Sequence, residues 1–272
     1  MQIALNDGHT IPQLGLGLWQ TPNAAAADIV AAALHAGYRH LDTAAIYGNE
    51  TGVGQGLAAA PTPRADVFVT TKLWNDAQGY DSTLRAARES LQRLRLDYVD
   101  LYLVHWPAPR RGLYVETWRA MIRLREEGLA RSIGVSNFCA EHLERIIGET
   151  GVTPAINQIE LHPRFQQRAL RAIHAKHGIA TQSWAPLGRS QALDDAVIKK
   201  IAARHARTPA QIVIRWHLDE GLIAIPKTAR RERLAENFDV FGFTLDDEER
   251  AAIAALDRAD GRIGPDPMTA AF

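Results

Sequence analysis

The sequence predicts an α/β fold in which eight parallel strands close into a (β/α)8 TIM barrel, a single domain over residues 1–272. Short runs rich in β-branched residues alternate with alanine-rich segments of helical period. The strand runs are almost continuously apolar, which is typical of parallel strands that are buried on both faces. Eight strand-then-helix units suit barrel closure, and an open doubly wound sheet is the alternative. No Ser/Pro-rich linker divides the chain.

Each element has its own sequence signal. The N-terminal IALNDGHTIPQL predicts a β-hairpin, because two apolar runs flank an Asn-Asp-Gly turn that accommodates positive φ. Gly37, Gly128 and Gly178 each stand between a helical segment and the next strand, as helix-ending glycines do. Strands are predicted near residues 14–18, 38–43, 67–72, 99–105, 131–136, 155–160, 179–184 and 221–226. Helices are predicted near 24–36, 51–59, 81–94, 115–127, 140–149, 166–176, 194–206 and 209–219, with extra C-terminal helices near 231–238 and 246–257.

The composition excludes several classes of protein. The 31 basic and 31 acidic side chains balance, and no basic run is interleaved with aromatic residues, so we expect neither a nucleic-acid nor a membrane partner. Cys139 is the single cysteine, which rules out an intrachain disulfide and suits the cytoplasm. The N-terminus lacks the pattern of a secretory signal. No metal-binding spacing of histidines or cysteines occurs, so we predict no metal.

Four polar residues stand at the ends of predicted strands or in the loops just after them: Asp42, Tyr47, Lys72 and His105. In a barrel all of them face one mouth. A tyrosine holds its proton up to pH ~10, so we expect the Lys72 ammonium to lower the pKa of Tyr47 toward neutrality, with Asp42 pairing with Lys72. His105 can orient a substrate oxygen by hydrogen bonding. The quartet predicts proton delivery during the reduction of a carbonyl.

A second group of residues indicates a nicotinamide cofactor. Ser136, Asn137 and Gln158 end two strands and offer polar groups that suit a planar carboxamide, although Ser136 and Asn137 suit helix capping almost as well. Trp184, in SWAPLG, could stack on the same ring or pack in the core. The segment IPKTARRER at 225–233 gathers cations that suit a phosphate at a helix start, or form a solvated basic face.

Other motifs carry weaker signals. GLGLWQ at 15–20 lacks the third glycine and the preceding unit of a dinucleotide-binding Rossmann fold. Trp19, Trp74 and Trp106 each come just after a strand, so we expect them to wall a substrate pocket, with core packing as the alternative.

The motifs GYRHLDTAAIYGNE, TTKLWN, DLYLVHWP, RSIGVSNF, NQIELHP, SWAPLG and IPKTARRERLAENFDVF, in this order, resemble the aldo-keto reductase superfamily over nearly the whole chain. Within it the sequence is most similar to bacterial 2,5-diketo-D-gluconate reductases. The resemblance implies a monomeric barrel that binds NADPH, with NADH possible but less favoured. It identifies Asp42, Tyr47, Lys72 and His105 with the catalytic tetrad, in which Tyr47 is the general acid.

The resemblance also implies the cofactor contacts. Ser136, Asn137 and Gln158 match the positions that bind the nicotinamide amide, and Trp184 matches the stacking aromatic residue. The remaining predicted contacts are Leu187 in the same strand-end loop, Lys227, Thr228 and Arg233 near the 2′-phosphate, and Glu236 and Asn237 near the adenine.

The expected activity is therefore NADPH-dependent reduction of a small aldehyde or ketone, such as a keto-sugar acid like 2,5-diketo-D-gluconate. Methylglyoxal or general aldehyde reduction is an alternative. A non-catalytic NADPH-sensing module and a Schiff-base aldolase that uses Lys72 are the other readings.

Overall fold

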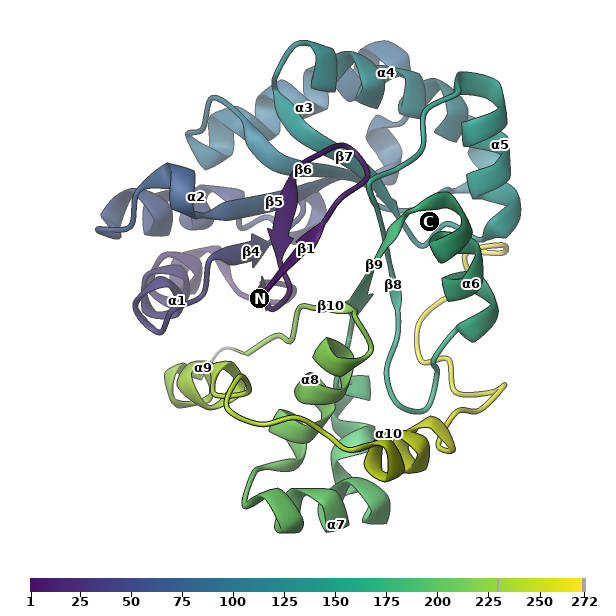
Figure 1. The fold of residues 1–272 in the computed structure, drawn as a ribbon. Helices are drawn as coiled ribbons and strands as arrows, with labels where there is room; N and C mark the ends of the chain where they lie inside the picture. The colour runs from purple at the N-terminus through teal and green to yellow at the C-terminus, as the bar shows by residue number, and fades with distance from the viewer. Residues whose placement is uncertain (229, 271–272) are drawn as a thin grey trace.

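Eight parallel strands form the centre of the molecule, and helices surround them (Figure 1). This computed structural model describes residues 1–228 and 230–270. The strands follow one another around the sheet in chain order. They are β3 (Leu16–Gly17), β4 (His40–Asp42), β5 (Phe68–Leu73), β6 (Val99–Val104), β7 (Ala130–Ser136), β8 (Ile156–Glu160), β9 (Ala180–Trp184) and β10 (Ile223–Ala224). All eight predicted strands are confirmed, several of them shorter than expected.

The first and last strands meet and close the barrel. Leu14 pairs with Ala224 and Gly17 with Lys227 in parallel bridges. The Gly17 N–H donates to the Pro226 carbonyl at 3.2 Å. A Cβ atom at Gly17 would lie only 2.8 Å from the Ile225 carbonyl oxygen, so this seam requires glycine. The closed barrel is thus confirmed over the open sheet. Gly17, which belongs to the GLGLWQ motif, allows the first and last strands to approach each other closely.

The helices follow the predicted order. They are α1 (Asn23–His35), α2 (Glu50–Ala59), α3 (Tyr80–Leu94), α4 (Tyr114–Glu126), α5 (Ala140–Thr150), α6 (Arg168–His177), α7 (Ala196–His205), α8 (Pro209–Asp219), α9 (Arg231–Phe238) and α10 (Asp247–Ala254). Among the described residues, no helix is both long enough and apolar enough to cross a membrane.

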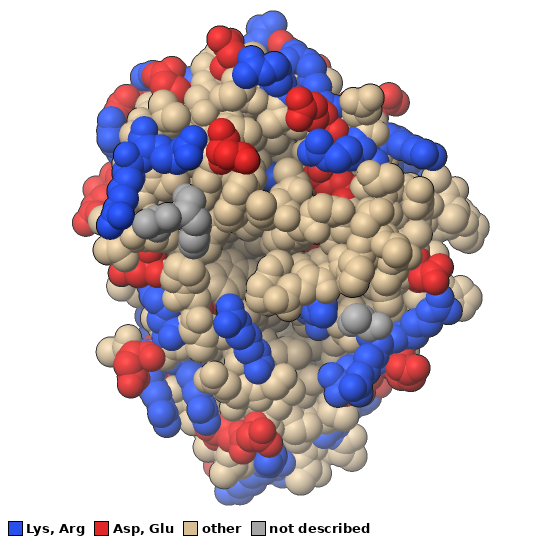
Figure 2. Space-filling view, turned by 180° about the vertical axis from the view of Figure 1, so that it is seen from behind, with Lys and Arg blue, Asp and Glu red and all other residues tan. Residues whose placement is uncertain are grey.

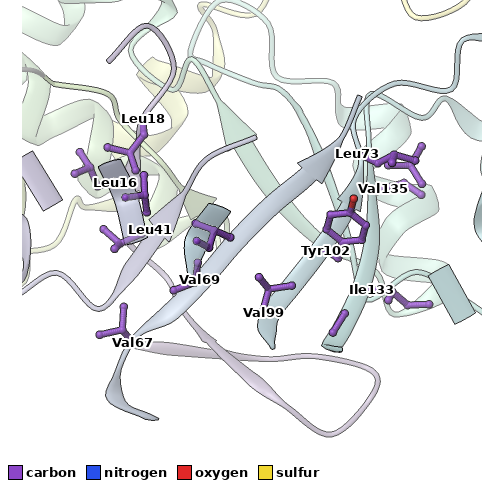
Figure 3. Packing of buried hydrophobic residues seen from close by; sticks show 14 of the residues in the cluster. Leu16, Leu18, Leu41, Val67, Val69, Leu73, Val99, Tyr102, Ile133 and Val135 are labelled. Carbon is purple, nitrogen blue, oxygen red and sulfur yellow. The ribbon is translucent and has the colours of Figure 1, made fainter. Parts of the chain in front are cut away.

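Residues along each strand alternate between the barrel interior and the helices. Outward side chains such as Leu41, Val69 and Tyr102 form the largest apolar cluster (Figure 3). The hairpin of β1 (Gln2–Ala4) and β2 (Thr10–Pro12) pairs in antiparallel register. Leu5, which follows β1, and Ile11 of β2 belong to a separate apolar cluster with Phe68, Leu101 and other strand residues. Among the described residues, the hairpin therefore covers the amino-terminal end of the barrel.

Candidate active site

A cavity of about 600 Å³ opens at the carboxyl ends of the barrel strands. Figure 2 views the molecule from the side opposite the hairpin of Figure 1 and shows a hollow near the centre, with a mostly uncharged surface around it. Twelve of the residues that the sequence singled out line this cavity: Trp19, Asp42, Tyr47, Trp74, His105, Trp106, Ser136, Asn137, Gln158, Trp184, Leu187 and Lys227. This is the end of the barrel at which such folds carry their chemistry.

The predicted quartet comes together at the floor of the cavity. Lys72 is fully buried, and its ammonium donates hydrogen bonds to Asp42 Oδ1 and, at 2.9 Å, to the Thr43 carbonyl. The same ammonium lies 5.2 Å from the centre of the Tyr47 ring. Tyr47 ends the 3₁₀ turn η1 (Ala45–Tyr47), and its ring meets the His105 ring edge to face at 5.7 Å between centroids. The expected pairing of Asp42 with Lys72 is confirmed.

The expected lowering of the Tyr47 pKa is wrong for the protein alone. Burial raises the pKa of Tyr47, and this effect outweighs the attraction of the Lys72 ammonium, which lowers it. Burial lowers the pKa of Lys72, but Asp42 and Tyr47 more than compensate, so its pKa is raised. Lys72 is therefore a permanent cation, and Tyr47 holds its proton at neutral pH.

His105 is a neutral imidazole at neutral pH. Burial, and then the nearby Lys72 charge, hold the pKa of His105 well below its usual range. Its Nδ1 atom is buried with no hydrogen-bond partner in the part of the chain that the structure describes. The Trp74 ring packs against it edge to face at 5.2 Å. A neutral imidazole at this place can donate one N–H to a carbonyl oxygen without placing a second cation beside Lys72.

One wall of the cavity carries the residues predicted to hold a carboxamide. Ser136 Oγ donates to the Gln158 carbonyl at 2.8 Å, and Asn137 Nδ2 donates to the His105 carbonyl at 3.0 Å. The indole N–H of Trp184 donates to Asn137 Oδ1 at 2.8 Å. Ser136 and Asn137 therefore do not cap the next helix, where Cys139 occupies the N-cap position. The wall combines fixed amide and hydroxyl groups with one aromatic ring, which fits the edge and face of a nicotinamide.

The residues predicted to bind the outer part of a cofactor lie at and beyond the rim. Lys227 is exposed and lines the cavity. Thr228 is buried, and its hydroxyl accepts the Arg230 N–H at 3.1 Å. The other predicted contacts are on α9 and do not line the cavity: Arg233, which is exposed, Glu236, which accepts a hydrogen bond from Thr208 Oγ1 at 2.8 Å, and Asn237, which is buried.

The three predicted tryptophans surround the mouth. Trp106 is buried, Trp74 is half-buried, and Trp19 is 42% exposed. The Arg189 guanidinium lies over the Trp19 ring at 5.6 Å, so the loop after β9 crosses toward the loop after β3. Arg110 and Arg111 form the exposed turn η4 (Pro109–Arg111) and do not line the cavity.

Sequence reasoning missed some lining residues. Ile46 adds an exposed apolar side chain next to Tyr47, which its neighbour could have suggested. Pro265 lines the cavity from the C-terminal segment. This segment is held by Glu160, whose carboxylate accepts the N–H groups of Ile263 at 2.6 Å and Gly264 at 2.8 Å. Such a distant contact leaves no local signal in the sequence.

Comparisons with known proteins find similar chains over almost the whole length of this one. The model of the Aldo/keto reductase family matches residues 13–258. An aldo-keto reductase of Mycolicibacterium smegmatis is 55% identical over 271 residues, covering 100% of this chain and 98% of the relative. The methylglyoxal reductase DkgA of Escherichia coli K12 is 54% identical, covering 97% of this chain and 96% of the relative.

Solved structures show the same likeness. The crystal structure of apo Gox0644 has a TM-score of 0.97 and 58% identity, covering 100% of this chain and 99% of that one. A Gox0644 variant in complex with NADPH gives the same values.

Proposed function

This chain belongs to the aldo/keto reductase family and is an oxidoreductase that uses a nicotinamide cofactor, and from that premise we propose that it reduces a small aldehyde or ketone with NADPH. The observation that carries the proposal is the buried Lys72 ammonium, which contacts Asp42 and lies beneath the Tyr47 ring at the floor of the cavity. A permanent cation beside a protonated phenol suits proton donation to an oxygen that gains negative charge.

Each member of the tetrad has one task in this proposal. Tyr47 donates its proton to the carbonyl oxygen. Although burial raises its pKa, an alkoxide is a much stronger base than a phenolate, so the transfer remains favourable, and Lys72 stabilises the phenolate that is left. Neutral His105 donates a hydrogen bond that orients the oxygen. Asp42 holds Lys72 in place, and the bound nicotinamide would supply the hydride.

The cofactor preference follows from the wall and the rim. Ser136, Asn137 and Gln158 would hold the carboxamide, while Trp184 and Leu187 would contact the ring side of the cofactor. Lys227, Thr228 and Arg233 would favour the 2′-phosphate of NADPH, and Glu236 and Asn237 would approach the adenine. The NADPH complex of the 58% identical Gox0644 variant supports NADPH over NADH.

We propose methylglyoxal and similar small aldehydes as the best substrates. Trp19, Trp74, Trp106 and Ile46 give the substrate side flat apolar walls, and relatives at 54% identity are methylglyoxal reductases. A keto-sugar acid such as 2,5-diketo-D-gluconate is the second candidate. Arg189 favours it, because this arginine lines the cavity and can pair with a carboxylate.

The test compares methylglyoxal with 2,5-diketo-D-gluconate in the wild type and in Arg189→Met, following NADPH oxidation by absorbance and repeating each assay with NADH. We expect the higher kcat/KM for methylglyoxal, unchanged within about twofold in the variant. A higher value for the keto-sugar acid that falls at least tenfold in Arg189→Met would assign the acid instead. Tight NADPH binding without turnover of any carbonyl would favour the sensing module.

Two further points belong to the proposal. The raised pKa of Lys72 disfavours a Schiff-base aldolase, which requires a neutral amine. We also propose that the protein acts as a monomer in the cytoplasm, without nucleic-acid or membrane partners. The zero net charge supports the expected absence of nucleic-acid and membrane partners, and the single cysteine supports the cytoplasm.

A further inference from the structure

A chain of buried polar side chains runs inside the barrel from the floor of the site toward the hairpin. Its members are His40, Gln182, Gln158 and Asp42, each at most 2% exposed. They come from strands β4, β9 and β8 and meet in the barrel interior. The mechanism above uses Asp42 and Gln158, but it gives His40 and Gln182 no task.

The hairpin end of this chain fixes the tautomer of His40. His40 Nδ1 lies 3.2 Å from the Pro12 carbonyl, which can only accept, so Nδ1 carries the proton. Burial lowers the pKa of His40 to about 3, so the ring is neutral and Nε2 is an acceptor. Gln182 Nε2 lies 3.3 Å from this atom and therefore donates to it. The sequence makes room for the ring, because a Cβ at Gly15 would lie 2.7 Å from His40 Cγ.

The orientation of Gln182 in turn fixes that of Gln158. With its nitrogen directed at His40, Gln182 presents Oε1 to Gln158 Nε2 at 3.0 Å. Gln158 Nε2 donates its other hydrogen to Asp42 Oδ2, with 2.7 Å between nitrogen and oxygen. A reversed Gln158 amide would set its oxygen against the Asp42 carboxylate and the Gln182 oxygen, leaving two pairs of acceptors in contact. The Pro12 carbonyl at one end of the chain of side chains and the Asp42 carboxylate at the other therefore favour the same orientation of the Gln182 and Gln158 amides.

We propose that His40 and Gln182 are positioning residues that orient the Gln158 amide, so that its Oε1 remains the acceptor available to the nicotinamide carboxamide while its nitrogen holds Asp42. The proposal rests on the cofactor-binding role proposed for Gln158. Gln158 lines the cavity, and both Nε2 hydrogens are engaged within the wall. Oε1 accepts no hydrogen bond from any described residue, so it is the polar atom of this amide left for a ligand.

A double-mutant cycle on NADPH binding tests the proposal without turnover. Gln182→Met keeps the volume but removes the acceptor and donor, so we expect NADPH affinity, measured by fluorescence titration, to fall about fivefold to tenfold, as for one lost hydrogen bond. Gln158→Ala alone should weaken binding at least as much. Adding Gln182→Met to Gln158→Ala should change the affinity less than twofold, because no amide remains to be oriented.

The matched control is Gln166→Met. Gln166 is also buried and donates to the Pro163 and Ile253 carbonyls, away from the chain of buried polar side chains. Its loss should therefore lower the stability of the protein but leave NADPH affinity unchanged. If the losses of NADPH affinity from Gln182→Met and Gln158→Ala add up in the double variant, or if Gln166→Met causes an equal loss, the proposed positioning role is wrong. An unchanged affinity in Gln158→Ala would instead overturn the proposed carboxamide site itself.

Ring-nitrogen NMR of the wild-type protein without cofactor gives a second test, which does not depend on any variant. The proposal requires His40 to be protonated at Nδ1 and unprotonated at Nε2 at pH 7. Nitrogen shifts with the opposite assignment would refute it.

Discussion

Replacing Lys72 by methionine should destabilise the protein far more than the loss of an ordinary ion pair. Lys72 is completely buried and Asp42 is 2% exposed. Without the ammonium, Asp42 keeps one hydrogen bond, from Gln158 at 2.7 Å, and otherwise lies uncompensated in the barrel. Removing one partner of a buried pair costs about 3–5 kcal/mol. At about 2–4 °C per kcal/mol for a protein of this size class, the melting temperature should fall by roughly 10 °C.

The assay is urea unfolding and thermal melting of the protein without cofactor. Lys199→Met is the matched control, because Lys199 pairs with Asp194 at 2.9 Å while 55% exposed, and its loss should cost no more than about 0.5 kcal/mol. The double variant Lys72→Met with Asp42→Asn should recover much of the loss, since no buried charge remains. A Lys72→Met variant as stable as the surface control would refute the reasoning.

Three further outcomes are expected. Tyr47→Phe should lower kcat by about 10²–10⁴ while NADPH affinity, from fluorescence, stays within twofold; near-normal turnover would exclude Tyr47 as the acid. Burial lowers the pKa of His174 and His217 to about 4. As the pH falls from ~6.5 toward 4, only the unfolded chain binds these two protons. The free energy of unfolding, measured by urea titration, should therefore fall by about 1.4 kcal/mol per pH unit for each ring. Stability that stays flat over this range would contradict their buried neutral state. Glu160→Ala should speed trypsin cleavage after Arg262 at least tenfold, because two hydrogen bonds to a carboxylate are lost, and an unchanged rate by mass spectrometry would show that the segment is held by other contacts.

Local sequence signals carried the fold and the floor of the site. Apolar runs that end in Asp42, Lys72 and His105 implied both the strands and the face to which these side chains point, because parallel strands share one carboxyl edge. The balance of forces on Tyr47 was not accessible in this way. It depends on how deeply the ring is buried relative to its distance from the cation, which only packing determines.

Long-range geometry accounts for the other differences. Ser136 and Asn137 precede a helix, as capping residues do, yet they bond across to neighbouring strands, and register alone decides between these uses. Pro265 reaches the cavity because Glu160, about a hundred residues earlier in the chain, binds the backbone next to it.

The pairing of the first and last strands also bears on the order in which the barrel folds. Gln13, beside the first strand, donates to the Leu218 carbonyl across a separation of 205 residues. Such closure comes late, because a long loop must be ordered before the contact forms, and on the ribosome it waits until the last strand has emerged. Lys227 lies at that seam and on the cavity rim. The cavity is therefore complete only after this seam has closed, and a ligand that binds only the closed barrel would stabilise the seam.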